Sequence, residues 1–466
     1  MARHIKCISP VDGRVYVDRP TASDAEIKET LEKATGAQKA WRHAPLNERA
    51  AVVVRVVDAL KGMGAEIADE LAWQMGRPIR YGQGELRGVE ERARYMAELA
   101  PTALAPVVPI DSRPGFERYV AREPVGIVFT IAPWNYPYLT AVNSVVPALI
   151  AGNAVLLKQA AQTLLVGDRF QKAFDSIGLP EGLFTHIVLE HGQTEAIISG
   201  GHVDHVAFTG SVEAGRAMER AAAGTFTTLG LELGGKDPAY VAPDANLKFA
   251  IENLVDGAFF NSGQCCCGIE RVYVHESRYD AFVKNFVELT AQYVLGDPLD
   301  QETTLGPMAR ANLAEIVRRQ TEEAIAKGAK AHLDPRSFIR DRPSSPYLAP
   351  QVLTNVDHTM AVMREESFGP VIGIAKVRDE EEAIALMNDS PYGLTASIWT
   401  EDVNVARRIG EAIETGTVYM NRCDYLDPGL AWTGVKDTGY GASLSSLGYG
   451  PLTRPKSYHL RLSTSG

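Results

Sequence analysis

Three cysteines stand side by side at Cys265, Cys266 and Cys267, directly after a Gly-Gln pair in a stretch too polar for a buried strand. A free thiol has a pKa of about 8.5, so a nucleophilic cysteine needs a nearby base or a positive field. The candidate base is Glu232, which lies between two leucines just before paired glycines. Burial there is expected to raise the pKa of its carboxyl group, which suits a general base. Buried structural thiols and a capping glutamate would explain the same residues, so this pair alone leaves both interpretations open.

Six motifs, taken in their order along the chain, decide between these interpretations. Together they resemble the signatures of the aldehyde dehydrogenase superfamily, and the resemblance covers nearly the whole sequence. Any one motif would be weak evidence, but six in the same order argue against coincidence. The motifs are Pro133-Trp-Asn-Tyr-Pro137, Phe208-Thr-Gly-Ser211, Leu231-Glu-Leu-Gly-Gly235, Gly263-Gln-Cys-Cys266, Glu366-Ser-Phe-Gly-Pro370 and Gly434-Val-Lys436.

The resemblance implies oxidation of an aldehyde to the acid with NAD or NADP as the hydride acceptor and without a metal. Cys266 would attack the aldehyde carbon to give a thiohemiacetal, and loss of hydride would leave a thioester. Asn135 would donate its side-chain amide to the developing oxyanion, and Glu232 would activate the water that releases the acid. Cys265 and Cys267 are expected to be structural and to point elsewhere, and three adjacent thiols are not expected to converge on a metal.

The resemblance also assigns a set of cofactor-binding residues, although the sequence has no Gly-x-Gly-x-x-Gly turn. Gly210 and Ser211 are expected to open a helix whose first amides hold phosphate, and Lys158 would reach the adenosine ribose. Trp134 and Phe368 would fit a hydrophobic core equally well if they were considered alone. The full set is Ile131, Trp134, Lys158, Gly210, Ser211, Leu233, Glu366 and Phe368.

Four positions are expected to line an apolar, aromatic-rich funnel that favours a medium-chain or aromatic aldehyde. They are Tyr136, Leu139, Leu426 and Trp432. Semialdehyde-carboxylate specialists of the family carry an Arg where this chain has Asn143, although Arg422 leaves a carboxylate-bearing substrate open.

The chain departs from the family pattern at three further positions. Ala161 replaces a Glu that holds both ribose hydroxyls, and losing that carboxylate predicts that NADP is tolerated. Ser144 and Ser443 replace a Lys and a Glu that carry the proton of the catalytic carboxylate outward. Because both ends of this relay are missing together, we expect a different proton exit through water.

The elements that must position these residues follow an alternating rhythm of short apolar strands and helical stretches, which is typical of parallel, doubly wound sheets. A capping box at Ser23 opens a helix to about Trp41, and Asn47 precedes a long helical pattern to about Met75. The predicted fold is α/β, with two doubly wound α/β domains, a Rossmann-like cofactor domain and a catalytic domain, plus a β-hairpin oligomerisation arm. The predicted bounds are 1–105 and 125–235 for the NAD(P)-binding domain, 236–446 for the catalytic domain, and 106–124 with 447–466 for the arm.

One stretch, residues 124–157, contains no charged residue and could be mistaken for a membrane span. Pro133, Pro137, Pro147 and three asparagines argue against a span, because they would leave polar groups unsatisfied in lipid. We therefore expect two buried strands that flank a buried helix.

Composition narrows the remaining function classes. The 466 residues carry 47 Lys plus Arg against 58 Asp plus Glu, and the resulting net charge of −11 disfavours nucleic acid and anionic membranes as partners. Five cysteines do not form a disulfide framework and no targeting segment is evident, so the expected location is the cytoplasm. An exposed hairpin edge predicts a homodimer or homotetramer. The alternatives are a CoA-acylating relative and a catalytically silent relative that acts as a binding protein.

Overall fold

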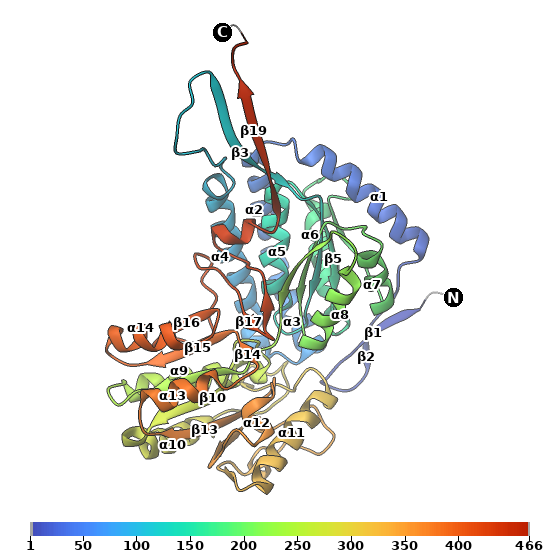
Figure 1. Cartoon of the computed structure of the whole chain (residues 1–466). Coiled ribbons are helices and arrows are strands. Elements are labelled where there is room, and N and C mark those ends of the chain that lie inside the picture. The colour runs from blue at the N-terminus through green and yellow to red at the C-terminus, as the bar shows by residue number, and fades with distance from the viewer. Residues whose placement is uncertain (1–2, 465–466) are drawn as a thin grey trace.

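Two open β-sheets, each covered by helices, organise the chain in a computed structural model that describes residues 3–464 (Figure 1). The first sheet has six strands in the order β18-β8-β7-β4-β5-β6, and its neighbours are parallel except for the antiparallel pair β18 and β8. Its strands are β4 (Ile127–Ala132), β5 (Ala154–Gln159), β6 (Phe184–His186), β7 (His205–Thr209), β8 (Thr228–Glu232) and β18 (Gly439–Tyr440). The helices between these strands are α5 (Pro137–Ala151), α6 (Leu164–Ser176), α7 (His191–Ser199) and α8 (Val212–Ala222).

The uncharged stretch forms β4, α5 and β5, as predicted. All six residues of β4 are buried, and α5 is buried along most of its length, because the sheet is covered on both faces. No helix within residues 3–464 is both long enough and apolar enough to span a membrane.

Four helices precede this sheet and pack their apolar faces into the same core. They are α1 (Asp24–Trp41), α2 (Leu46–Gly62), α3 (Gly64–Met75) and α4 (Ile79–Ala103). The capping box at Ser23 is confirmed, since Ser23 and Glu26 exchange hydrogen bonds at the start of α1. The single long helix predicted after Asn47 is wrong: the chain breaks at Met63, whose ψ of 12° is not helical, and two helices result. The Gly62-Met-Gly64 sequence permits this break because glycine stabilises a helix poorly.

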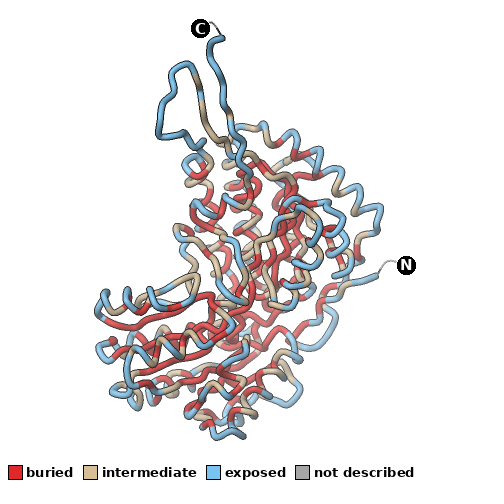
Figure 2. Tube along the Cα trace, viewed as in Figure 1, coloured by how far each residue is buried: buried red, intermediate tan, exposed pale blue. Residues whose placement is uncertain are grey.

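The second sheet has seven strands in the order β11-β12-β13-β10-β9-β15-β16, and they are parallel apart from β11 against β12. Figure 2 shows the strands of both sheets as mostly buried and the outer helix faces as exposed. The strands of the second sheet are β9 (Asp237–Val241), β10 (Ile269–His275), β11 (Lys330–Ala331), β12 (Gln351–Thr354), β13 (Val371–Val377), β15 (Thr395–Trp399) and β16 (Thr417–Met420). Its helices are α9 (Leu247–Phe259), α10 (Glu276–Thr290), α11 (Ala311–Ala326), α12 (Ala361–Arg364), α13 (Glu380–Asn388) and α14 (Val403–Ala412).

Two antiparallel strands form the arm that projects from the top of the molecule in Figure 1. β3 (Phe116–Pro124) pairs with β19 (Thr453–Arg461) along its whole length. The predicted hairpin at 106–124 is only partly correct, because its first half touches the second through one bridge, between Val107 and Val120. The C-terminal strand supplies the pairing instead. Two short strand pairs complete the fold: β1 (His4–Ile8) with β2 (Val15–Pro20), and β14 (Tyr392–Gly393) with β17 (Val435–Lys436).

The chain crosses between the sheets where the candidate residues lie. β8 ends at Glu232, and five residues later β9 begins in the other sheet at Asp237. The cysteines occupy the loop between α9 and β10 of the second sheet. The topology therefore brings the end of a first-sheet strand next to a loop of the second sheet.

Candidate active site

A cavity of about 300 Å³ contains the central thiol, and we call it the thiol pocket. It brings together two of the three predicted catalytic residues and all four predicted substrate-wall residues. These residues are Cys266, Glu232, Tyr136, Leu139, Leu426 and Trp432. Leu233, which was predicted to bind cofactor, also lines this pocket.

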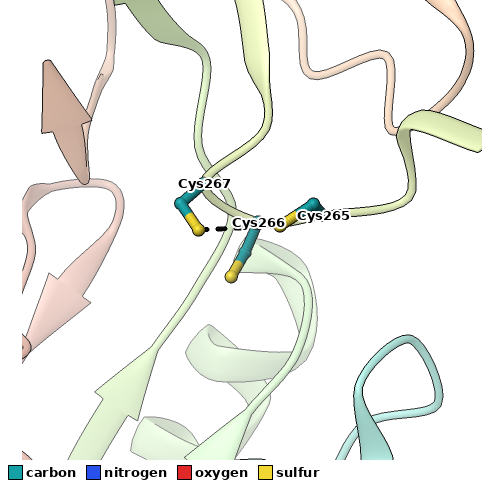
Figure 3. Close-up of side chains that lie close together, drawn as sticks. All are labelled: Cys265, Cys266 and Cys267. Carbon is teal, nitrogen blue, oxygen red and sulfur yellow. Dashed lines mark hydrogen bonds between the residues drawn. The ribbon is translucent and has the colours of Figure 1, made fainter. Parts of the chain in front are cut away.

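The three cysteines do not point in three unrelated directions. Figure 3 shows the Cys266 side chain directed away from the sulfurs of its two neighbours. The sulfurs of Cys265 and Cys267 lie 3.5 Å apart, and both thiols donate to Asp424, at 3.0 and 3.2 Å. Cys265 and Cys267 thus point away from the Cys266 side chain, as predicted, and they share one direction. Alternate residues of an extended segment share one side, which here faces a carboxylate.

The three sulfurs nevertheless lie within 4.8 Å of one another, so their positions in the fold do not by themselves rule out a shared metal ion. Hydrogen bonds from the neighbouring thiols and from backbone amides lower the pKa of Cys266 well below its usual value. The pKa values of Cys265 and Cys267 are raised. Burial raises the pKa of Asp424 to about 7. The central sulfur is thus the group of the three that ionises most readily, as a nucleophile requires.

Glu232 ends β8 with its carboxylate held by two hydroxyl groups. Ser443 donates to one oxygen at 2.6 Å and Thr209 donates to the other at 3.1 Å. Burial is the largest influence on this group and raises its pKa, although both hydroxyls act in the opposite direction. Ser144 does not reach Glu232 but bonds to the hydroxyl of Thr130, at 2.7 Å. Of the two serines at the predicted relay positions, only Ser443 contacts the candidate base.

Asn135 does not line the thiol pocket, but it is tied to the cysteine loop. Its side-chain amide donates to the backbone oxygen of Gln264, at 3.3 Å, two residues before Cys266. Its own backbone oxygen accepts from Arg77 and from the side-chain amide of Asn261. Asn261 also donates to the Gln264 oxygen, at 3.2 Å. These bonds bind the turn after β4 to the loop that carries the thiols.

Arg77 is the centre of this network. Its guanidinium is 3% exposed and contacts Glu85, Asn135 and Asn261. Glu85, which is equally buried, accepts the first backbone amides of α5, from Tyr138 and Leu139. One buried ion pair therefore joins α4, the start of α5 and the cysteine loop.

The predicted cofactor residues of the first sheet lie at or just beyond the carboxyl ends of its strands. Ile131 is near the end of β4, and Lys158 is near the end of β5, where burial lowers the pKa of its ammonium group. Lys158 has no hydrogen bond or ion pair to any residue of the described 3–464 range. Gly210 precedes Ser211, which caps α8 by accepting the amide of Ala214. A half-buried ammonium without a protein partner in residues 3–464 and a helix N-terminus, at the carboxyl ends of strands of one sheet, fit a phosphorylated, hydroxyl-bearing ligand.

Glu366 and Phe368 lie just before β13 of the second sheet, and Trp134 lies just after β4 of the first. Glu366 accepts the backbone amide of Gly235, at 2.8 Å, and burial raises its pKa to about 8. A Cβ on Gly234 would lie 2.6 Å from the Glu366 carboxylate, so a side chain there would displace that carboxylate. Phe368 meets Trp134 edge to face, with ring centroids 5.6 Å apart. The second oxygen of Glu366 has no protein donor in residues 3–464 and could accept ribose hydroxyls.

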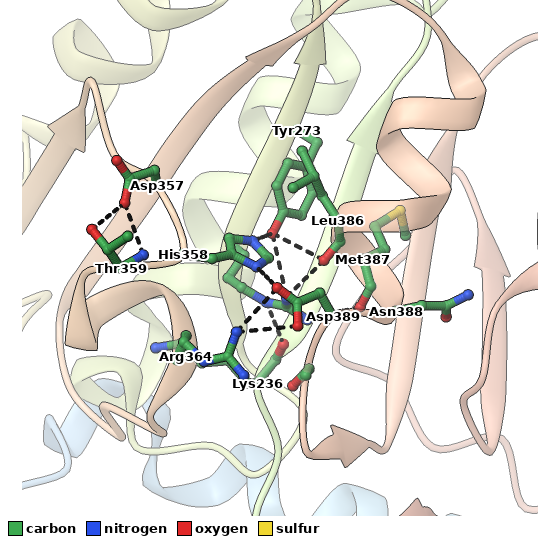
Figure 4. A network of polar contacts seen from close by, with 12 residues as sticks. Lys236, Tyr273, Asp357, His358, Thr359, Arg364, Leu386, Met387, Asn388 and Asp389 are labelled. Atoms are coloured by element: carbon green, nitrogen blue, oxygen red, sulfur yellow. Dashed lines mark hydrogen bonds and ion pairs between the residues drawn. The ribbon is translucent and has the colours of Figure 1, made fainter.

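A second buried ion pair holds this segment. Glu270 of β10 accepts the backbone amides of Ser367 and Phe368, and it also pairs with Lys236. Figure 4 shows the polar network behind Lys236. There the backbone oxygen of Lys236 accepts Arg271, at 2.9 Å. The network continues through Tyr273, His358, Asp389 and Arg364.

Three residues of the pocket surroundings were not predicted as site residues. Arg92 of α4 and Asp424 line the pocket, and Thr209 touches the base. Thr209 lies inside the predicted motif at 208–211, but neither Arg92 nor Asp424 belongs to any pattern in the sequence. Arg422 is not in the pocket wall and stacks on the ring of Tyr425, 3.5 Å from its centroid.

Comparisons with known proteins show which proteins this chain is similar to. The family model for the aldehyde dehydrogenase family matches residues 1–457. A succinate-semialdehyde dehydrogenase [NADP(+)] of Deinococcus radiodurans is 33% identical over 97% of this chain and 94% of its own. The succinate semialdehyde dehydrogenase [NAD(P)+] Sad of Escherichia coli is 33% identical over 96% of both chains. The crystal structure of lactaldehyde dehydrogenase from Escherichia coli has a TM-score of 0.93 at 29% identity, covering 99% of this chain and 96% of that one.

The lowered pKa of Cys266 has a consequence for alkylation. Iodoacetamide reacts with thiolates, and between pH 8 and pH 6 an ordinary thiol loses roughly 80-fold of its thiolate. The rate at Cys266 should fall by less than about tenfold over this interval, as fragment masses of the tryptic peptide 249–271 would show. Cys265 and Cys267 should react more slowly at both pH values, and a Cys266→Ser variant should lose the fast phase. A fast phase that follows the ordinary thiol profile would contradict the lowered pKa.

Replacing Arg77 by Met should destabilise the protein by about 3–5 kcal/mol, because the buried carboxylate of Glu85 would lose its partner. Urea unfolding would measure the loss. Arg87→Met on the exposed face of α4, the helix that carries Glu85, is the control and should change stability little. The double variant Arg77→Met, Glu85→Met should recover part of the loss. Equal stability of the Arg77 and Arg87 variants would show that the pair is not required.

Proposed function

The chain belongs to the aldehyde dehydrogenase family. We propose that Cys266 and Glu232 carry out its oxidation of an aldehyde to the carboxylic acid, and that water takes the acyl group from the thioester. The observation that carries the proposal is that a thiol of lowered pKa and a carboxyl group of raised pKa line one pocket. The lowered pKa leaves the nucleophile ionised, and the raised pKa of the base lies closer to neutral pH, as the two half-reactions require.

In the first half-reaction the Cys266 sulfur forms a bond to the aldehyde carbon and the carbonyl oxygen becomes an oxyanion. A side-chain amide has two N–H groups, so Asn135 can donate one to this oxygen while the other remains on Gln264. A bound nicotinamide would supply the hydride acceptor, and loss of the hydride from the thiohemiacetal carbon would leave the thioester on Cys266. In the second half-reaction Glu232 takes a proton from water, the hydroxide attacks the thioester, and the Cys266 thiolate leaves as the acid forms.

The cofactor is NAD or NADP. The residues proposed to hold it are Lys158 for the adenosine ribose, the first turn of α8 at Gly210 and Ser211 for phosphate, and Glu366 for the nicotinamide ribose. Ile131, Trp134, Leu233 and Phe368 would supply the apolar contacts. We propose that 1–105 and 125–235 form the cofactor domain and that 236–446 form the catalytic domain.

For the substrate, the walls formed by Tyr136, Leu139, Leu426 and Trp432 support an aldehyde with an apolar body, either a medium-length chain or an aromatic ring. A second candidate is a small polar aldehyde, because relatives are named for succinate semialdehyde and lactaldehyde. The buried cation Arg92 in the same wall favours this candidate.

We propose that the β3–β19 arm, with 106–124 and 447–466, joins copies of the chain into a homodimer or homotetramer in the cytoplasm. Val108 and Ile110 beside β3 are 67% and 107% exposed, and apolar residues in that position suit burial against a partner. Sedimentation equilibrium would distinguish these states, and a monomer at all concentrations would refute the proposal.

A Glu232→Gln variant should separate the two half-reactions. It should still release about one NAD(P)H per active site in a burst, while steady-state turnover falls by about 10²- to 10⁴-fold. A Cys266→Ala variant should lose both. Acid should form from the parent enzyme without added CoA, whereas a strict need for CoA would identify an acylating enzyme. Full steady-state turnover in the Glu232 variant would remove that residue from the mechanism.

The absence of a carboxylate at Ala161 predicts that NADP is used as well as NAD. The measurement is kcat/KM for the two cofactors with one aldehyde. The expected ratio is below about 100 in either direction, whereas a ratio above this in favour of NAD, about 2.7 kcal/mol, would refute the hypothesis. An Ala161→Glu variant should shift the ratio towards NAD, because it restores repulsion against a 2′-phosphate.

A further inference from the structure

Arg92 is a buried cation without a counter-ion in the wall of the thiol pocket. The residue is 8% exposed, and one of its nitrogens, Nη1, donates to the backbone oxygen of Leu139 at 2.9 Å and to the side chain of Asn143 at 3.2 Å. No carboxylate within residues 3–464 forms an ion pair with it, and neither Nε nor Nη2 has a protein acceptor there.

The other buried arginines within residues 3–464 have acceptors for more of their nitrogens. Arg77 pairs with the carboxylate of Glu85, and all three guanidinium nitrogens of Arg271 donate to backbone oxygens or to the hydroxyl of Tyr273. A guanidinium keeps its charge in proteins, and a buried charge is costly unless it is paired and hydrogen-bonded. Arg92 is thus retained in a site that supplies two neutral acceptors and leaves most of its donors unused.

A second unused donor lies beside it. The side-chain nitrogen Nδ2 of Asn143 is buried and has no partner among the described residues, while the oxygen of the same amide accepts Arg92. Both residues line the thiol pocket. Buried polar groups are rarely left unpaired in a protein that has no use for them, so unpaired donors on two neighbouring helices point to an acceptor-bearing ligand.

The pocket also contains carboxylates that could compete for Arg92. Asp424 accepts the thiols of Cys265 and Cys267, Glu91 accepts the hydroxyl of Tyr425, and Glu232 accepts two hydroxyls. Asp256 lines the pocket and its carboxylate has no partner within residues 3–464, yet it forms no ion pair with Arg92. The donors of Arg92 therefore remain available to a bound molecule.

We infer that Arg92, assisted by Asn143, is the specificity-determining residue of this enzyme and binds a carboxylate at the end of the aldehyde that does not react. The inference rests on the proposed function and names its substrate class: an aldehyde with a short apolar chain or ring that ends in a carboxylate. The planar fork of a guanidinium matches a carboxylate with two parallel hydrogen bonds. The apolar residues Leu139, Leu426 and Trp432 would contact the part between the two ends.

The test compares two aldehydes of nearly equal shape, 4-carboxybenzaldehyde and 4-methylbenzaldehyde. The measured quantity is the ratio of their kcat/KM values, in which any general loss of activity cancels. The parent should prefer the carboxylate. In Arg92→Met this ratio should fall by about 10- to 100-fold, mainly through KM for the carboxylate, and Arg92→Lys should restore part of it. Arg94→Met, an exposed position on the same helix whose side chain pairs with Asp58 and Glu90, is the matched control and should keep the parental ratio.

A chain-length series of ω-oxo acids with four to seven carbons, each against the unsubstituted aldehyde, should give one length with the highest preference. An unchanged ratio in Arg92→Met, or a parent that prefers the methyl compound and every unsubstituted aldehyde, would overturn the inference. If no aldehyde is oxidised at all, the proposed function fails, and calorimetric binding of 4-carboxybenzaldehyde still decides this inference. Binding should then be weaker in Cys266→Ala, Arg92→Met than in Cys266→Ala, and equal binding would overturn it.

Discussion

The buried ion pair between Arg77 and Glu85 is the interaction on which the geometry of the site depends. An aldehyde must meet an amide from the turn after β4 and a thiol from the loop before β10, and these segments belong to different sheets. Arg77 contacts the backbone of Asn135 and the side chain of Asn261 at the same time, while Glu85 holds the first amides of α5. An ion pair is costly to bury, but once buried it cannot lose one partner cheaply, so it defines a single arrangement of the three segments.

Within that frame, opposite environments separate the ionisation of the two reacting groups. Hydrogen bonds from the neighbouring thiols and from backbone amides favour the thiolate of Cys266. Desolvation at the end of β8 favours the protonated form of Glu232. The two groups share one pocket, so their different pKa values come from hydrogen bonding and desolvation rather than from distance. Asp424 contributes by fixing the two outer thiols on the opposite side of the loop from the central one.

Buried charges and close backbone contacts also position the residues proposed to bind the cofactor. The segment from Glu366 to Phe368 is held by Glu270, whose carboxylate also neutralises Lys236 at the crossover between the sheets. Gly234 and Gly235 allow close approach there: a Cβ on Gly235 would lie 2.3 Å from the backbone oxygen of Cys266. Thus the paired glycines after the base permit contact between the base strand, the thiol loop and the ribose-binding carboxylate.

The sequence by itself determined the features that depend on local order along the chain. The alternation of apolar strands and helices, the capping box at Ser23, and the burial of the uncharged stretch follow from periodicity and from the cost of leaving polar groups unpaired. The residues Cys266 and Glu232 could be chosen because each stands in a short motif of recognisable spacing.

Only the tertiary structure decided the features that depend on residues far apart in the chain. The common direction of Cys265 and Cys267 comes from Asp424, which lies at least 157 residues further along the chain. The break at Met63 depends on how α2 and α3 pack, which helix periodicity in the sequence does not show. The sequence did not indicate a role for Arg92, because an arginine on a helix is ordinarily solvated. Its burial without a carboxylate partner results from the packing of α4 against α5.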